Sequence, residues 1–100
     1  MENNYPEFIA KLEKTDPKLY ESVSGIYDLS MAPGELDAKT KILITLALDA
    51  LSGSSEGVRV LSKIARNMGV SDKQIAEALR LAYFVAGNSV LDAMKAAFTE

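Results

Sequence analysis

The chain has 100 residues, enough for one small domain, of which 48% are hydrophobic and 25% are charged. This composition is typical of a folded globular protein and excludes the low hydrophobicity of disordered chains. The sequence contains no cysteine and no histidine, which excludes disulfides, thiol redox centres, and metal sites built from thiolates or imidazoles. The formal net charge of −3 offers no broad basic field for phosphates, so we expect no nucleic-acid partner.

No segment has the pattern of a signal peptide or of a membrane-spanning helix. Residues 1–12 carry polar and charged side chains where a signal peptide needs an apolar core. The longest apolar stretch, residues 42–51, is about half of the ~20 residues that a spanning helix needs, and Thr45 and Asp49 interrupt it. We therefore expect a cytoplasmic protein with no membrane partner.

Two helices are expected in the N-terminal third of the chain. Asn4 or Tyr5, followed by a proline and a glutamate, is typical of a helix start, because proline suits the first turn and an acidic side chain complements the helix dipole. This first helix should extend to about residue 14. Asp16 and Pro17 repeat the signature and predict a second helix to about residue 29.

A third helix is expected over residues 38–51, after a break at residues 32–34, with Asp37 as its N-cap. A polar stripe runs along it, with successive members four, four and three residues apart: Lys41, Thr45, Asp49 and Ser52. Because this polar stripe is narrow, the helix is apolar around most of its circumference and should lie at the centre of the fold. Its wide apolar surface suggests that another subunit covers part of it.

A fourth helix is expected over residues 55–68, capped by hydroxyls of the turn at residues 52–55 and ended by Gly69. Ser71 and Gln74 form a capping box that starts the next helix. A hydrophobic staple is expected from the two apolar residues around that start, Val70 and Ile75.

The fifth helix should run from Ser71 to Gly87, and Ser89 should cap a last helix over residues 89–98. No alternating strand pattern occurs. The sequence therefore predicts an all-α fold, a bundle of about six helices in a single domain over residues 1–100.

From Leu36 onward, the sequence resembles the carboxymuconolactone decarboxylase and alkylhydroperoxidase D-like family. The resemblance is strongest over residues 36–98, its most specific part is the run from residue 67 to residue 79 together with the downstream Gly87, and residues 1–31 supply the N-terminal helices. It implies an all-α, alkylhydroperoxidase D-like fold. It also implies a homo-oligomer, a trimer or a hexamer, because the family commonly forms these.

The resemblance implies a relay site that this chain has lost. Peroxidase members of the family use a glutamate, a Cys-x-x-Cys pair and a histidine, and decarboxylase-type members also carry the histidine. Counting back from Gly69, these positions are occupied here by Ile42, Ser54, Gly57 and Leu61. A serine hydroxyl without a base does not replace a thiolate, so we predict no thiol peroxidase activity. The sequence supports no catalytic residue, no metal and no cofactor.

A candidate small-molecule pocket remains at the turn where the family has its redox site. In this hypothesis Glu56 is a general base, Arg59 is the charge partner of a bound anion, and Asp49 is a pocket-lining acid that Thr45 could hydrogen-bond. The candidate residues are Ser54, Ser55, Glu56, Asp49 and Arg59. The alternative interpretation is simpler: the serines and Glu56 only cap a helix, and Asp49 lies at the exposed edge of its helix.

Arg59, Lys63 and Arg66 are four and three residues apart, so they form a basic stripe along one side of the fourth expected helix. Its side chains are interpreted as solvated or salt-bridged. They could alternatively face Glu7 and Glu13 of a neighbouring subunit.

Three functions are compatible with these residues. The first is a thiol-free oligomer of the family with a small-molecule pocket of unknown use. The alternative is a structural or partner-binding homo-oligomer whose former active site is filled by Ile42 and Leu61. The third is a divergent enzyme, of lactone or decarboxylation type, that uses Glu56 or Asp49 as its acid or base.

Overall fold

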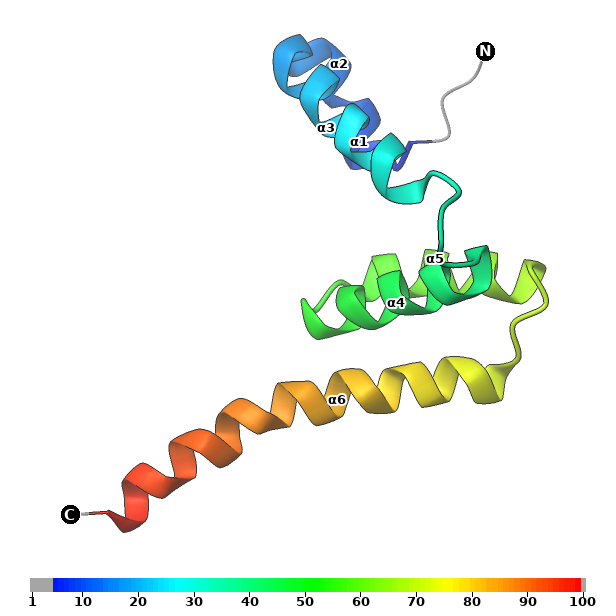
Figure 1. The fold of residues 1–100 in the computed structure, drawn as a ribbon. Helices are drawn as coiled ribbons and strands as arrows, with labels where there is room; N and C mark the ends of the chain where they lie inside the picture. The colour runs from blue at the N-terminus through cyan, green and yellow to red at the C-terminus, as the bar shows by residue number, and fades with distance from the viewer. Residues whose placement is uncertain (1–4, 100) are drawn as a thin grey trace. The chain divides into compact units, whose positions relative to one another are not determined.

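The structure is a computed structural model that describes residues 5–99, and every regular element within this range is helical (Figure 1). The predicted all-α class is therefore confirmed. The chain divides into two compact units, Met1–Gly34 and Glu35–Glu100, and their boundary falls at the predicted break. The elements are α1 (Glu7–Ala10), α2 (Leu12–Thr15), α3 (Pro17–Met31), α4 (Ala38–Leu51), α5 (Ser55–Asn67), α6 (Asp72–Met94) and a terminal 3-10 helix, η1 (Lys95–Phe98).

In the first unit, two short helices replace the first predicted one. Pro6 precedes α1 as its N-cap, while Asn4 lies outside the described residues. Lys11 separates α1 from α2 but keeps helical backbone angles, φ −63° and ψ −25°, so the interruption is a single residue of turn. The predicted cap of α3 is confirmed, since the Asp16 carboxylate accepts a hydrogen bond from the backbone N–H of Leu19 at 3.1 Å.

Tyr5 ties the start of the first unit to α3. Its ring contacts Tyr20 and Tyr27 edge-on, with centroids 6.1 and 5.4 Å apart. Its hydroxyl donates to Asp28 Oδ2 at 2.9 Å, and this hydrogen bond raises the pKa of Tyr5 above its ordinary value. One half-buried aromatic ring thus joins segments that lie more than twenty positions apart in the sequence.

In the second unit, α4 contacts both α5 and α6, which confirms the predicted central position of this helix (Figure 1). Leu46 on α4 is fully buried. The core cluster around it is formed by one residue or more from each of the three helices and from the α5–α6 turn: Ile42, Leu46, Ala65, Val70 and Ile75. The core of the second unit is therefore formed against the apolar side of α4.

Local hydrogen bonds start α4 and α6 where the sequence predicts. The Asp37 carboxylate accepts from the N–H of Thr40 at 2.8 Å, and this bond holds the pKa of Asp37 below its ordinary value. Ser71 and Gln74 form the complete capping box at 3.1 and 2.9 Å. Both predicted staple residues, Val70 and Ile75, are buried in the core.

The predicted helix break at Gly87 is wrong. Helix α6 runs without interruption from Asp72 to Met94. A glycine inside a helix costs about 1 kcal/mol relative to alanine, which destabilises the helix but does not end it. Ser89, the expected cap, donates its hydroxyl to the carbonyl of Ala86 at 3.1 Å, so its side chain bonds within the helix instead of starting a new one.

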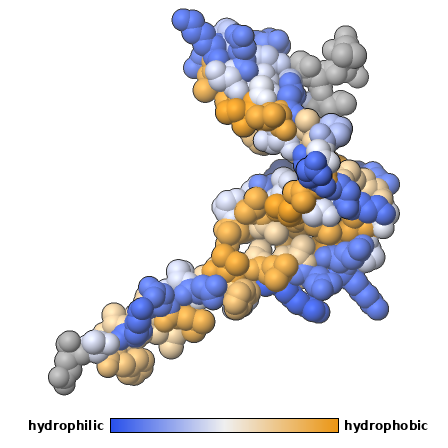
Figure 2. Space-filling view, viewed as in Figure 1, coloured by the Kyte–Doolittle hydropathy of each residue, from blue (hydrophilic) through white to orange (hydrophobic). Residues whose placement is uncertain are grey.

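The C-terminal half of α6 has an apolar surface that the unit itself does not cover (Figure 2). The large apolar side chains of α6 and η1 from position 81 onward are between 49% and 86% exposed, and they are Leu81, Tyr83, Phe84, Val85, Val90, Leu91, Met94 and Phe98. A helix that is apolar on most sides is normally buried. In residues 5–99, no helix has both the length and the apolar character needed to cross a membrane.

Candidate functional site

The turn between α4 and α5 uses Ser54 as a helix cap. Gly53 has φ +81°, a left-handed conformation that favours glycine. Ser54 follows as the N-cap of α5, and its Oγ accepts a hydrogen bond from the N–H of Gly57 at 3.1 Å. The capping interpretation of Ser54 is confirmed. The hydroxyl at the family's first cysteine position is thus engaged by the backbone of its own helix.

Gly57, at the family's second cysteine position, lies directly against the side chain of Asp49 on α4. A Cβ atom added to Gly57 would overlap Asp49 Oδ2 and would lie 2.7 Å from Ser54 Oγ and 2.8 Å from Asp49 Cγ. Close-packed interiors do not tolerate contacts this short. The half-buried carboxylate of Asp49 therefore occupies the space that a cysteine side chain would need.

Asp49 has neither of the environments that the sequence suggests. Its carboxylate faces Gly57 instead of lying at an exposed helix edge, and the residue as a whole is half-buried. Thr45 does not serve as its donor, because the Thr45 hydroxyl donates to the carbonyl of Lys41 one turn earlier at 2.8 Å. The Asp49 backbone carbonyl accepts hydrogen bonds from Ser52 Oγ at 3.1 Å and from the N–H of Ser54 at 2.9 Å.

The other two relay positions are packing positions. Ile42 is 4% exposed and belongs to the core cluster of the second unit. Leu61, on α5, is partly buried and packs against the same cluster. An apolar side chain at each position contributes to burial but provides no group that exchanges a proton.

Glu56 and Arg59 pair with each other on the surface of α5. Arg59 Nε donates to Glu56 Oε2 at 3.0 Å, and its second nitrogen contacts Oε1. The hydrogen bond from Arg59 holds the pKa of Glu56 below its ordinary value, and the same contact raises the pKa of Arg59. A carboxylate stabilised in its ionised form is a weaker base, which argues against Glu56 as a general base. Ser55, the first residue of α5, is exposed.

Arg66 of the basic stripe also forms a local contact. Arg66 Nε donates to Asp72 Oδ1 at 2.7 Å. Glu7, one of the acidic residues suggested as a partner for the stripe in a neighbouring subunit, pairs within its own chain with Lys11 at 3.3 Å. The interpretation of the stripe as a salt-bridged surface is therefore confirmed for Arg59 and Arg66. Such exposed pairs contribute little to stability.

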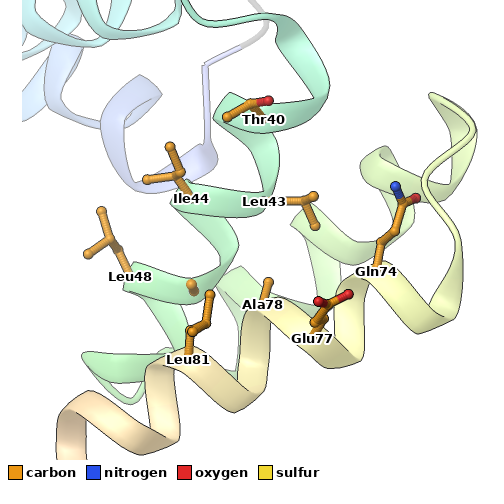
Figure 3. Close-up of a pocket in the computed structure, with 9 residues that line it drawn as sticks. Thr40, Leu43, Ile44, Leu48, Gln74, Glu77, Ala78 and Leu81 are labelled. Carbon is orange, nitrogen blue, oxygen red and sulfur yellow. The ribbon is translucent and has the colours of Figure 1, made fainter.

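An open groove that sequence reasoning missed lies between α4 and α6 (Figure 3). Its volume is about 440 Å³, within the range of small-molecule sites. The lining residues are mostly apolar: Thr40, Leu43, Ile44, Ala47, Leu48, Gln74, Glu77, Ala78 and Leu81. The candidate residues at the α4–α5 turn are not among them. The wide apolar face of α4 was the only sequence signal for this groove.

The structure thus brings Asp49, Ser54 and Gly57 together and pairs Glu56 with Arg59. In the described part of the chain, no cluster of three or more acidic residues has a geometry that could hold a metal ion. The arrangement at the turn supports capping and packing, and it contains no nucleophile paired with a base.

Comparison with known proteins agrees with this fold. A crystal structure of a protein from Methanobacterium thermoautotrophicum superposes with a TM-score of 0.79 at 22% identity, covering 93% of this chain and 100% of that one, and shows the fold alone. A protein of Methanocaldococcus jannaschii, described as uncharacterized, is 28% identical over 81 residues, which are 81% of this chain and 76% of that protein. The model of the carboxymuconolactone decarboxylase family matches residues 17–100. The chain therefore belongs to the carboxymuconolactone decarboxylase family.

Proposed function

We propose that this chain is a member of the carboxymuconolactone decarboxylase family without thiol chemistry, which acts as a homo-oligomer and whose former relay site is filled. One observation carries the proposal: a cysteine side chain at Gly57 would overlap the carboxylate of Asp49. The other relay positions agree with it, since Ile42 and Leu61 pack in the core and Ser54 caps α5. A filled site favours a structural or partner-binding role over catalysis at this turn.

The exposed apolar surface supports the homo-oligomer. Tyr83 is 81% exposed and Phe98 is 86% exposed, and they lie among the uncovered apolar side chains of α6 and η1. Patches of this extent in a folded protein normally mark an interaction site. A trimer or a hexamer, the assemblies implied by the family resemblance, would bury such a surface between copies.

An assay with hydroperoxide tests the loss of thiol chemistry. We expect purified protein, mixed with cumene hydroperoxide and dithiothreitol, to consume peroxide no faster than buffer alone, because the chain has no thiolate and no imidazole base. A cysteine-dependent peroxidase in the same mixture is the positive control. Turnover above the buffer rate that scales with protein concentration would contradict the proposal.

A second candidate function is favoured by the groove between α4 and α6. It is apolar along most of its length, and Thr40, Gln74 and Glu77 provide polar atoms in its lining. The Gln74 carbonyl oxygen already accepts a hydrogen bond from Ser71 in the capping box, so the Gln74 NH2 group, Thr40 and Glu77 are the polar groups that could orient a ligand. A small molecule with an apolar body and one hydrogen-bonding or cationic group fits this chemistry.

Filling the groove tests this second function. Ala47 is half-buried and lines the groove, so Ala47→Phe should occupy part of it. If a small molecule binds there, solvent extraction and mass spectrometry of the purified protein should detect it at about one molecule per groove, and Ala47→Phe should reduce its amount at least tenfold. Ser89→Phe, outside the groove, is the matched control. Equal amounts in both variants, or no molecule in the unmodified protein, would contradict the ligand function.

A further inference from the structure

Helix α6 carries apolar side chains on most sides, including one face against the core and a second face beside it. One face packs within the second unit through Ile75 and Ala82, which are 5% and 8% exposed. The other face follows positions separated alternately by four and three residues, and an open groove runs along it. We call this second face the α6 seam; it consists of Ala76, Arg80, Tyr83, Gly87, Val90 and Met94. By helical geometry the seam lies about a quarter of a turn around α6 from Ile75 and Ala82, and its large apolar side chains are exposed.

The spacing of the seam identifies the shape of its partner. Alternating steps of four and three average 3.5 residues, the repeat that keeps one line of side chains facing a second helix along its length. At its middle, Gly87 is half-buried, and a Cβ added there would meet no atom within 4 Å. No contact inside the unit therefore requires a glycine at this point, whereas a second helix crossing there could approach the bare backbone closely.

The amount of apolar surface fits a second copy of the chain. The large apolar side chains on the seam and in the groove along it, Tyr83, Phe84, Val90, Leu91 and Met94, expose roughly 600 Å², if an aromatic side chain contributes about 200 Å². A standard protein interface buries about 800 Å² on each partner. A second copy brings the same α6 seam, so both surfaces would be covered in one contact.

Charged side chains favour one relative direction of the two helices, parallel or antiparallel. In a parallel pair, each Arg80 would lie beside the Arg80 of the other copy, and like charges there would repel. In an antiparallel pair that crosses at Gly87, Arg80 faces Met94 of the other copy. Glu77 then lies within about one helical turn of Lys95 of the other copy, an opposite charge that in a single copy pairs with Asp92 at 2.8 Å and would exchange this partner. Glu77 forms none of the ion pairs found in residues 5–99, so its carboxylate is available for this contact.

We infer that α6 pairs with α6 of a second copy, antiparallel and crossing at Gly87, through the α6 seam. This inference rests on the proposed homo-oligomer and adds its contact surface and symmetry. The contact is twofold, so it occurs in a dimer or in a hexamer built from two trimers, but not in an isolated trimer.

Disulfide cross-linking tests the register, because the natural chain has no cysteine that would give a background. Under mild oxidation, we expect Gly87→Cys to form a covalent dimer, because two Cα atoms at the crossing point lie within reach of a disulfide. Tyr83→Cys combined with Val90→Cys should also cross-link, while each of these single variants should not. Ser89→Cys, on another face of α6, is the control and should stay monomeric on denaturing gels.

Each result distinguishes this contact from the broader proposal. Cross-linking by Tyr83→Cys alone would overturn the antiparallel direction, and no cross-link in any variant would overturn the contact. Light scattering adds an independent measurement: Val90→Glu should lower the mass of the oligomer at least twofold while circular dichroism shows the helices intact. An unmodified protein that remains at the 10.8 kDa of one chain would contradict the homo-oligomer itself. An unmodified oligomer whose mass is unchanged by Val90→Glu would contradict the α6 contact alone.

Discussion

Replacing Ile42 with glutamate, the residue that the family relay has at this position, is expected to lower the free energy of unfolding by about 3–5 kcal/mol at neutral pH. Ile42 is 4% exposed, and its neighbours in the core cluster are all apolar. The new carboxylate would lose its hydration without a charged partner. A loss of this size is a large fraction of the 5–15 kcal/mol that stabilises a typical domain.

The pH dependence of this variant checks the cause. Burial raises the pKa of a carboxyl group, so the folded variant binds its proton more tightly than the unfolded chain. The loss of stability should therefore be greatest above the raised pKa and should shrink as the pH falls through it. Urea unfolding at several pH values measures this. The controls are Ile42→Val, expected to cost about 0.5–1.5 kcal/mol, and Ile44→Glu at a position that is 45% exposed. Equal losses for glutamate at positions 42 and 44 would contradict a buried site.

Replacing Gly57 with alanine is expected to destabilise the protein by about 1–3 kcal/mol, the usual cost of forcing extra volume into a packed site. The added Cβ would overlap Asp49 Oδ2 and crowd Ser54 Oγ, the atom that caps α5. Both side chains would have to move, and the movement of Ser54 would weaken the cap. Thermal and urea unfolding, followed by circular dichroism, measure the change.

A double-mutant cycle with Asp49→Ala isolates the contact between Asp49 and Gly57. Without the Asp49 carboxylate, Gly57→Ala should cost at least about 1 kcal/mol less, because only the contact with Ser54 Oγ remains and alanine is a better helix former than glycine. The difference between the two effects of the same substitution is the coupling energy. If Gly57→Ala has the same effect in both backgrounds, Asp49 does not occupy the cysteine space.

This cycle also bears on how the relay was lost. Asp49 and Gly57 come from different helices, and in this chain each is compatible with the other only while position 57 has no side chain. Restoring the cysteine pair would therefore require the Asp49 side chain to move or to be replaced, in addition to changes at the relay positions. The packing of α4 against α5 thus places the Asp49 side chain at the second cysteine position, in a sequence that contains no cysteine.

The candidate site could be predicted only in part. The four relay replacements followed from the resemblance, and the caps at Ser54 and Ser71 followed from residue type. The Glu56–Arg59 pair, three residues apart on one helix, is also a local contact. The close approach of Asp49 to Gly57 could not be predicted, because it depends on how two helices pack after the turn between them.

By itself, the sequence determined the all-α class, the starts of α3, α4, α5 and α6, and the exclusion of thiol and imidazole chemistry. These features depend on composition or on hydrogen bonds that span three or four residues, such as the one from Thr40 to Asp37. Only the tertiary structure decided that α6 continues through Gly87, that Asp49 fills the cysteine space, and that a groove separates α4 from α6. Each of these features depends on the sum of the packing energies of several helices. A local signal such as one glycine, worth about 1 kcal/mol, does not determine that sum.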